Sequence, residues 1–228
     1  MTSQHTLELH GIALTGVHQH AVHTGAELAE RLAQHQGSQY GSLPVGSALS
    51  ALFPSGGLER GQIYGCRGDA SLSLLYALIA RATQVGSWVA TVNLFSLGLM
   101  SAREHGVALQ RLLCVDAGTQ AATWTQVLGA CVDGLDVVVA HAPKCSLYDA
   151  RRIEARLKAH GSVLIIVGDP GVFSPAVVLS SHTTQWEFST HASRREVDVV
   201  ATGRRVHGRG KCTLTFPPHS QHMEHVHT

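Results

Sequence analysis

The segment from Gly65 to Leu72 has the glycine content and the position of a phosphate-binding loop, because it lies between a predicted strand and a predicted helix. Such a loop follows the pattern G-x-x-x-x-G-K-[S/T]. Its backbone amides surround the phosphates, its lysine neutralises the outer ones, and its hydroxyl binds Mg²⁺. Here Ala70 stands at the second glycine, Ser71 at the lysine and Leu72 at the hydroxyl. Both counter-charges that phosphoryl transfer requires are therefore missing.

Two charged residues in the same segment change its electrostatics. Asp69 puts a carboxylate where phosphate oxygens would lie, and like charges repel. Arg67 is able to contact a phosphate by itself, although a solvated loop arginine is the simpler interpretation. We interpret Gly65, Arg67, Gly68, Asp69 and Ser71 as a degenerate phosphate loop. The pattern predicts no catalytic residue, no enzymatic activity and no bound cofactor, with weak nucleotide binding as the open alternative.

Short β-branched runs alternate with longer helical stretches in the middle of the chain. The predicted strands are 62–64, 87–92, 111–115, 135–140 and 163–167, and the predicted helices are 47–52, 70–84, 101–105, 119–132 and 147–160. This alternation is typical of a parallel sheet with helical crossovers. After Gly168, four short strand candidates without helices predict an antiparallel extension at one edge: 177–179, 184–188, 196–201 and 212–216.

Composition divides the chain into three parts. Residues 1–42 are expected to form a poorly ordered segment with one helix, because Thr24 and Glu27 make a capping box before a helical apolar pattern. Residues 43–217 form the α/β domain, and residues 218–228 form a flexible, histidine-rich tail.

The overall charge excludes a whole-chain attraction to nucleic acid or membrane. The 228 residues include 17 Lys and Arg against 16 Asp and Glu, which gives a net charge of +1. No apolar run reaches the roughly 18–20 residues of a membrane span, and the N-terminus does not read as a signal peptide. The five cysteines are scattered and form no CxxC pair, which favours reduced thiols. We expect a cytoplasmic protein without membrane contact.

Histidine is common, with 16 residues in the chain. Imidazole binds transition metals. The terminal histidines nevertheless lack an acidic or cysteine partner at a fixed spacing, and terminal segments are usually loose. We therefore predict no metal site for the two terminal groups, which are His18, His20 and His23, and His219, His222, His225 and His227.

A basic stretch lies near the C-terminal end. Six cations fall within eighteen residues: Arg194, Arg195, Arg204, Arg205, Arg209 and Lys211. Cations on adjacent strands are able to follow a nucleic-acid backbone, so the stretch predicts non-specific, salt-sensitive DNA binding. A charged hairpin edge that prevents strand pairing is the alternative. No aromatic residue interrupts the stretch, which argues against base stacking there.

Two aromatic residues, Trp186 and Phe188, alternate with polar neighbours. The alternation predicts that both side chains share one face of a strand. Core packing is the usual reason for such a pair, and we expect it here. An exposed anchor for a partner protein is the alternative.

Residues 43–75 resemble the entry to the core of RecA-like proteins. In that family a Gly-Gly-Leu-x-x-Gly turn leads into the first strand, and residues 56–61 and 62–65 match the turn and the strand end. The resemblance resumes at residues 106–113 and 135–140. It implies a RecA-like three-layer α/β domain with a mainly parallel sheet, helices on both faces and a β-rich C-terminal extension.

Two further positions depart from RecA-like ATPases. Those enzymes carry a water-activating acid just past the second strand and a Mg²⁺-binding carboxylate at the end of a later apolar strand. Here Phe95, after Asn93, stands at the first position and His141 at the second. The resemblance therefore does not imply hydrolysis or strand exchange.

The second half of the chain is similar to the ImuA group of small actinobacterial RecA-like proteins. The similar parts are residues 159–168, Trp186, 194–205 and 212–216. This resemblance implies a non-catalytic accessory protein in DNA repair and damage-induced mutagenesis, within the SOS response and translesion synthesis. The implied partners are an inactive Y-family polymerase homologue and an error-prone polymerase, held on this scaffold. Contact with DNA and assembly into a homo-oligomer stay open.

A cell-division inhibitor that binds a tubulin-like filament protein is the main alternative class of function, because SulA-type proteins are also degenerate RecA-like folds. The arginine-rich stretch favours the repair interpretation. A hydrolase has no support, since neither G-x-S-x-G nor H-E-x-x-H occurs and the carboxylates near strand ends follow no spacing rule: Asp116, Asp133, Asp136 and Asp169.

Overall fold

Strands and helices alternate along the chain. The computed structural model describes residues 41–141, 145–188, 192–206 and 210–218. The strands are β1 Ser42–Pro44, β2 Gly57–Glu59, β3 Ile63–Gly68, β4 Val89–Val92, β5 Leu112–Val115, β6 Val137–His141, β7 Val163–Val167, β8 Val177–Phe188, β9 Ala192–Thr202 and β10 Gly210–Phe216. The helices are α2 Ser47–Ser50, α3 Ser71–Gln84, α4 Leu99–Glu104, α5 Ala121–Gly134 and α6 Leu147–His160, with a 3-10 turn, η1, at Leu109–Arg111.

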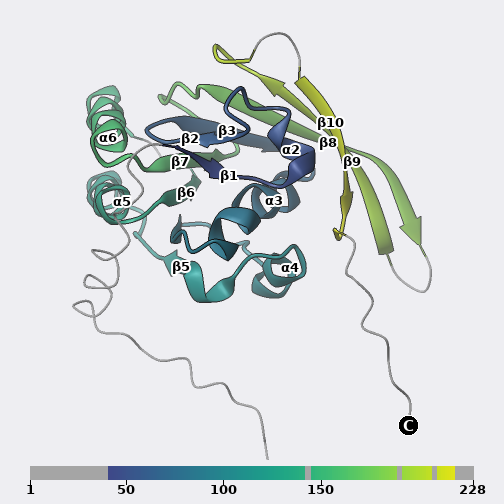
Figure 1. Ribbon diagram of the computed structural model, residues 1–228. Coiled ribbons are helices and arrows are strands. Elements are labelled where there is room, and N and C mark those ends of the chain that lie inside the picture. Colours follow the sequence, from purple (N-terminus) through teal and green to yellow (C-terminus); the bar gives the residue numbers. More distant parts are fainter. Residues whose placement is uncertain (1–40, 142–144, 189–191, 207–209, 219–228) are drawn as a thin grey trace, which may run out of the picture.

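In the described part of the chain, eight strands form one mixed sheet in the order β10-β9-β8-β3-β7-β6-β4-β5 (Figure 1). The neighbours from β8 to β5 pair in parallel. Antiparallel pairing joins β8 to β9 and β9 to β10. The protein is therefore an α/β protein with a mainly parallel sheet, as predicted.

Helices cover both faces of the parallel strands and bury two apolar clusters. On one face, α3 packs against the sheet through Leu74 and Leu78, next to Tyr64 of β3. On the other face, α5 and α6 contribute Trp124 and Ile153. Figure 1 shows α5 and α6 side by side, apart from α3. Burial on both faces explains why β6 and β7 are almost wholly apolar.

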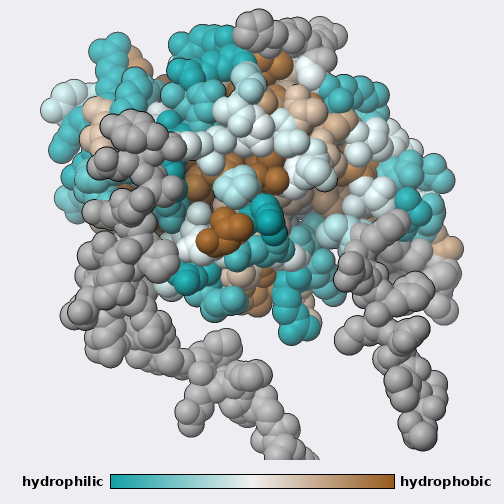
Figure 2. All heavy atoms as spheres, viewed as in Figure 1, coloured by the Kyte–Doolittle hydropathy of each residue, from teal (hydrophilic) through white to brown (hydrophobic). Residues whose placement is uncertain are grey.

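On the face shown in Figure 2, polar residues cover most of the surface and hydrophobic residues gather in the middle, near β1 and α3. Within the described ranges, every helix is too short or too polar to cross a membrane. The predicted N-terminal helix, both histidine groups and Arg209 lie outside the described residues.

A short strand occupies part of the segment predicted to be only a turn. β2 pairs antiparallel with β1, so that Gly57 lies opposite Pro44. A Cβ on Gly57 would overlap the carbonyl oxygen of Leu43, so a glycine is needed for the two backbones to approach. The Gly-Gly-Leu sequence therefore contributes a strand to a second, two-stranded sheet.

The last three strands extend one edge of the main sheet and pair antiparallel with one another, which agrees in part with the predicted extension. The two short strands expected at 177–179 and 184–188 are one strand, β8, which pairs in parallel with β3 and antiparallel with β9. A bulge at Thr184 shifts the β8–β9 register between Thr183 and Gln185. The polar sequence around the bulge explains why β8 reads as two separate strands.

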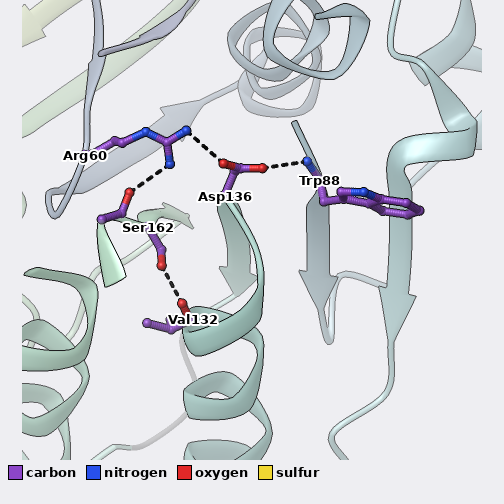
Figure 3. A network of polar contacts seen from close by, with 6 residues as sticks. Arg60, Trp88, Val132, Asp136 and Ser162 are labelled. Carbon is purple, nitrogen blue, oxygen red and sulfur yellow. Dashed lines mark hydrogen bonds and ion pairs between the residues drawn. The ribbon is translucent and has the colours of Figure 1, made fainter. Parts of the chain in front are cut away.

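A polar network joins the amino ends of four strands (Figure 3). Arg60 donates from Nη2 to Oδ1 of Asp136 at 2.8 Å and from Nη1 to the carbonyl of Gly161 at 3.1 Å. The other carboxylate oxygen of Asp136 accepts the backbone N–H of Trp88 at 3.0 Å. Ser162 donates its hydroxyl to the carbonyl of Val132. These contacts tie the starts of β3, β4, β6 and β7 together.

Candidate functional site

The junction between β3 and α3 lies where the phosphate loop was expected. β3 continues to Gly68, beyond the predicted strand end, and α3 begins at Ser71, so only Asp69 and Ala70 separate them. The backbone from Gly65 to Gly68 is part of the sheet, paired with β8 throughout and with β7 at its start. The first four of the eight residues predicted as a loop therefore use their backbone groups within the sheet, where those groups are unable to surround a phosphate.

Gly68 allows β3 and β8 to approach closely. Its φ is +110°, a conformation that side-chain-bearing residues rarely adopt. A Cβ at this position would overlap the Ser181 carbonyl oxygen and lie 2.6 Å from the Ser181 hydroxyl oxygen. That hydroxyl donates to the carbonyl of Arg67 at 3.0 Å. The glycine therefore serves strand packing in this protein.

Asp69 fixes the start of α3 to β8. Its two carboxylate oxygens accept the backbone N–H of Thr183, each at 3.0 Å, and Nδ1 of His182 lies 3.8 Å from Oδ2. Burial alone would raise the pKa of this carboxyl group. The Thr183 hydrogen bonds and the nearby His182 and Arg195 outweigh that effect, so the pKa of Asp69 lies below its usual value.

The lowered pKa of Asp69 predicts a pH-dependent contribution to stability. A depressed native pKa stabilises the fold above the unfolded-state pKa, and the contribution disappears as the pH falls through the native pKa. Asp69→Asn should therefore unfold at lower urea than wild type near about pH 6, and the difference should shrink in acid. Because half of this side chain is exposed, we expect a small effect, below about 1 kcal/mol. A difference that grows in acid would contradict the assignment.

Arg67 and Ser71, two further residues of the predicted loop, lie in different surroundings. Arg67 is exposed and donates from Nε to the Ser180 hydroxyl at 2.9 Å. Since Cys66 faces the α3 cluster, Arg67 faces the opposite side of the sheet. The thiol of Cys66 donates a hydrogen bond to the backbone carbonyl of Ser71, with 3.2 Å between sulfur and oxygen. Burial raises the pKa of that thiol to about 12. The five predicted loop residues therefore do not converge on one site.

Of the two positions expected to lack carboxylates, His141 contacts the neighbouring strand, whereas Phe95 lies in solvent. Asn93 has a φ of +53° and accepts the Ala117 N–H at 2.8 Å while donating to the Gly118 carbonyl at 2.7 Å, so it joins the ends of β4 and β5. Phe95, two residues later, is strongly exposed. His141 lies with Nδ1 3.0 Å from the Val167 carbonyl oxygen.

The four carboxylates considered near strand ends lie apart. Asp136 belongs to the amino-end network, whereas Asp116 and Asp169 follow β5 and β7 at the opposite edge and accept nearby backbone N–H groups. Asp133 lies on α5 and pairs with Arg156 at 3.4 Å. Among the described residues, no three acidic, histidine or cysteine side chains are grouped as metal ligands.

The basic stretch is divided between two ends of β9. Arg194 and Arg195 lie near the start of β9, whereas Arg204 and Arg205 follow its end. Lys211 pairs with Val200 in the sheet register, near the second pair. These cations are close in the sequence, but in the structure they do not form one compact basic surface.

Carboxylates offset several of these cations. Lys211 places Nζ 2.8 Å from Oδ2 of Asp198, and Arg205 pairs with Glu59. Arg194 lies between two carboxylates, 4.0 Å from Glu187 and 3.9 Å from Glu196. Arg204 is exposed and donates to the Ser174 carbonyl at 3.4 Å. The local field is accordingly weaker than the sequence suggests.

An exposed aromatic pair lies beside the first two arginines. Trp186 and Phe188 share one face, as predicted, and their ring centroids are 6.1 Å apart. They are 49% and 71% exposed, so the expectation of core packing is wrong. Arg195 lies over the Trp186 ring at 5.0 Å and over the Phe216 ring at 5.9 Å. We call Trp186, Phe188 and Arg195 the aromatic–arginine face.

The bulge at Thr184 creates this face. Arg195 is two residues from Val197, which is buried against the α3 side, and strand alternation places both side chains on that side. If Thr184 paired regularly with Glu196 instead of forming a bulge, Gln185 would lie opposite Arg195 in place of Trp186. The sequence did not reveal this contact, because the basic stretch itself contains no aromatic residue. The Trp186 ring comes from the neighbouring strand and reaches Arg195 only through strand pairing.

Residues 51–171 match a family model described as the MT3502 N-terminal domain. The match covers just over half of the 228 residues; it begins directly after α2 and extends past the end of β7. It includes the β3–α3 junction and excludes β8, β9 and β10. No curated protein matches the chain.

Proposed function

We propose that this chain, which belongs to the family of the MT3502 N-terminal domain, acts by binding other macromolecules and not by hydrolysing nucleotides. The proposal assigns it as a RecA-like accessory protein of the ImuA type in damage-induced mutagenesis. It would hold an inactive Y-family polymerase homologue and an error-prone polymerase together. Non-specific contact with DNA is a secondary part of the same proposal.

The β3–α3 junction is the observation that carries the non-catalytic part of the proposal. Phosphoryl transfer relies on positioning and on positive counter-charge around the transferred group. At this junction a two-residue turn replaces the loop, Asp69 supplies a negative charge, and the backbone of Gly65 to Gly68 pairs within the sheet. These features favour a RecA-like domain that was retained for binding.

The repair part of the proposal depends on the resemblance that spans residues 40–217. Within that stretch the structure has helices on both faces of a mainly parallel sheet, which is compatible with a RecA-like core. Exposed cations such as Arg67 and Arg204 support at most weak, salt-sensitive DNA contact. Protein binding is therefore the larger part of the proposed function.

Affinity purification from DNA-damaged cells of the native host tests the proposal. The tagged full chain should recover an inactive Y-family homologue or an error-prone polymerase, identified by mass spectrometry, and recovery should survive nuclease treatment. An untagged strain treated in parallel is the control. Recovery of a tubulin-like division protein, or of no polymerase-type protein, would reject the assignment.

Restoring the missing lysine should not restore ATPase activity. In Ser71→Lys the new ammonium would lie at the start of α3, but the turn before it would still have only two residues and Leu72 would still lack a hydroxyl for Mg²⁺. We expect phosphate release to stay at the background level of wild type, measured with purified protein, ATP and Mg²⁺. Turnover above that background would show that the proposed alignment and the non-catalytic assignment are both wrong.

A further inference from the structure

We infer that the aromatic–arginine face is a docking site for a segment of a partner protein that carries an apolar side chain next to a carboxylate. This inference rests on the proposed scaffold function and specifies where the scaffold binds. The face lies on β8 and β9, outside the 51–171 stretch that matches the family. It would therefore be a binding surface that the family match does not describe.

No contact among the described residues explains the exposure of the aromatic pair. Trp186 and Phe188 stack on each other, yet both keep large fractions of their surface in solvent. Figure 1 shows β8 and β9 extending beyond α3 on the right-hand side, where β8 ends and β9 begins. Tryptophan and arginine are enriched among the residues that contribute most binding energy at protein interfaces. The exposed, stacked rings of Trp186 and Phe188 beside Arg195 have the composition of such an interface.

Arg195 is held in position but lacks a carboxylate. It donates to the Ser73 hydroxyl of α3 and lies between the rings of Trp186 and Phe216. No carboxylate of the described residues lies within ion-pair distance of this guanidinium, and the nearby Asp69 is engaged with Thr183. A carboxylate of the partner would form an ion pair with the Arg195 guanidinium. Because the guanidinium is already oriented, the contact would be bidentate.

An apolar cavity adjoins the face through a shared residue. Phe216, which contacts Arg195, also lines a cavity of about 340 Å³ between α2, α3 and β10. Leu49, Ala77 and Leu214 form further parts of its wall. A cavity of this size accommodates a large apolar side chain. The partner segment we infer would place such a side chain there and its carboxylate at Arg195.

Charge argues for protein over single-stranded DNA as the occupant. Aromatic stacking beside arginine also occurs in single-strand binding sites, but those sites surround the rings with positive charge. Here Asp69 lies close to Arg195, while Glu187 and Glu196 offset Arg194 on the other side of the two strands, so positive charge does not surround the rings. The Asp69 carboxylate would repel a phosphate backbone that follows the rings, whereas a short protein segment needs to contact only Arg195.

Tryptophan fluorescence gives a direct readout of this face. The chain has three tryptophans, and Trp88 and Trp124 are buried, so quenching by acrylamide reports mainly on Trp186. The probes are the purified polymerase-type protein recovered with the full chain, a single-stranded oligo-dT, and buffer over a range of protein concentrations. We expect the polymerase-type protein to shift the emission to the blue and to protect Trp186 from acrylamide. Trp186→Phe should remove that signal.

Variants then test the face by affinity. Trp186→Ala and Phe188→Ala should each raise the Kd for the polymerase-type partner by roughly 30-fold, and Arg195→Gln by roughly 10-fold. Tyr148→Ala is the matched control, because Tyr148 is also 71% exposed but lies on α6, on the opposite side of Figure 1. It should bind as wild type does. Circular dichroism and urea unfolding should show that all four variants keep the wild-type fold.

The outcomes separate this inference from the function on which it rests. If the wild type binds the polymerase-type protein and the three face variants bind equally well, the docking site is wrong while the proposed function stands. If the wild type binds no polymerase-type protein, the proposed function fails and the inference falls with it. Protection of Trp186 by oligo-dT, or by increasing protein concentration alone, would assign the face to DNA or to a second copy and overturn the inference.

Discussion

Gly68→Ala should destabilise the protein by about 4 kcal/mol, because two penalties act at once. The residue has a φ of +110°, which strains any side-chain-bearing residue, and its new Cβ would overlap the Ser181 carbonyl oxygen of β8. Relief would require β3 and β8 to separate at the point where they pair. Urea unfolding at neutral pH, followed by circular dichroism, measures the loss.

Gly86→Ala is the matched control for this prediction. Gly86 has nearly the same conformation, with a φ of +109°, but a Cβ added there would meet no atom within 4 Å. Only the backbone strain remains, and it should cost about 1–2 kcal/mol. If Gly68→Ala and Gly86→Ala lowered the free energy of unfolding equally, the close approach of β3 and β8 would not add to the cost at Gly68.

Asp136→Ala should cost about 3 kcal/mol, the second large effect expected for a single substitution. The side chains of Asp136 and Arg60 are only 18% and 19% exposed, so removing the carboxylate leaves a largely buried guanidinium without its counter-charge. The backbone N–H of Trp88 loses its acceptor as well. The same unfolding experiment measures the change, which should appear as a lower midpoint in urea.

Asp133→Ala provides the comparison for the ion pair. Asp133 also pairs with an arginine, Arg156, but the two side chains are 35% and 44% exposed and lie 3.4 Å apart. Solvent screens such a pair, and its loss should cost less than about 1 kcal/mol. If Asp133→Ala lowered the free energy of unfolding as much as Asp136→Ala, burial in the amino-end network would not explain the effect at Asp136.

The elements that sequence predicted best are those with local signals at both ends. The bounds of α6 agree with the structure, because Ser146 caps its first turn through Asp149 and Gly161 ends it with a φ of +68°. β7 also agrees, since a five-residue apolar run between polar residues has few other interpretations. Local chemistry was sufficient for these elements.

Contacts between distant residues explain most of the differences. β3 extends to Gly68 because β8 pairs with it there, and the Asp69 carboxylate finds its partner at Thr183, 114 residues later. No spacing rule within residues 65–72 contains that information. The shape expected for the phosphate loop was therefore wrong, because β3 occupies the first four residues of that segment.

The candidate binding face depended on a single inserted residue. Alternation correctly placed Trp186 and Phe188 on one face, but the Thr184 bulge decides which face that is. The bulge arises from pairing with β9, so propensity and pattern within β8 do not reveal it. The same pairing brought Arg195 next to Trp186, where sequence showed only an arginine-rich stretch without aromatic residues.

The position of β3 in the sheet has a consequence for how the chain folds during synthesis. β3 is the first strand of the main sheet to leave the ribosome, yet one of its two neighbours, β8, begins at Val177. A nascent chain that ends at residue 171 would carry the whole family-matched stretch and leave one edge of its central strand open to other chains. Completion of the native sheet must therefore wait for the last quarter of the protein.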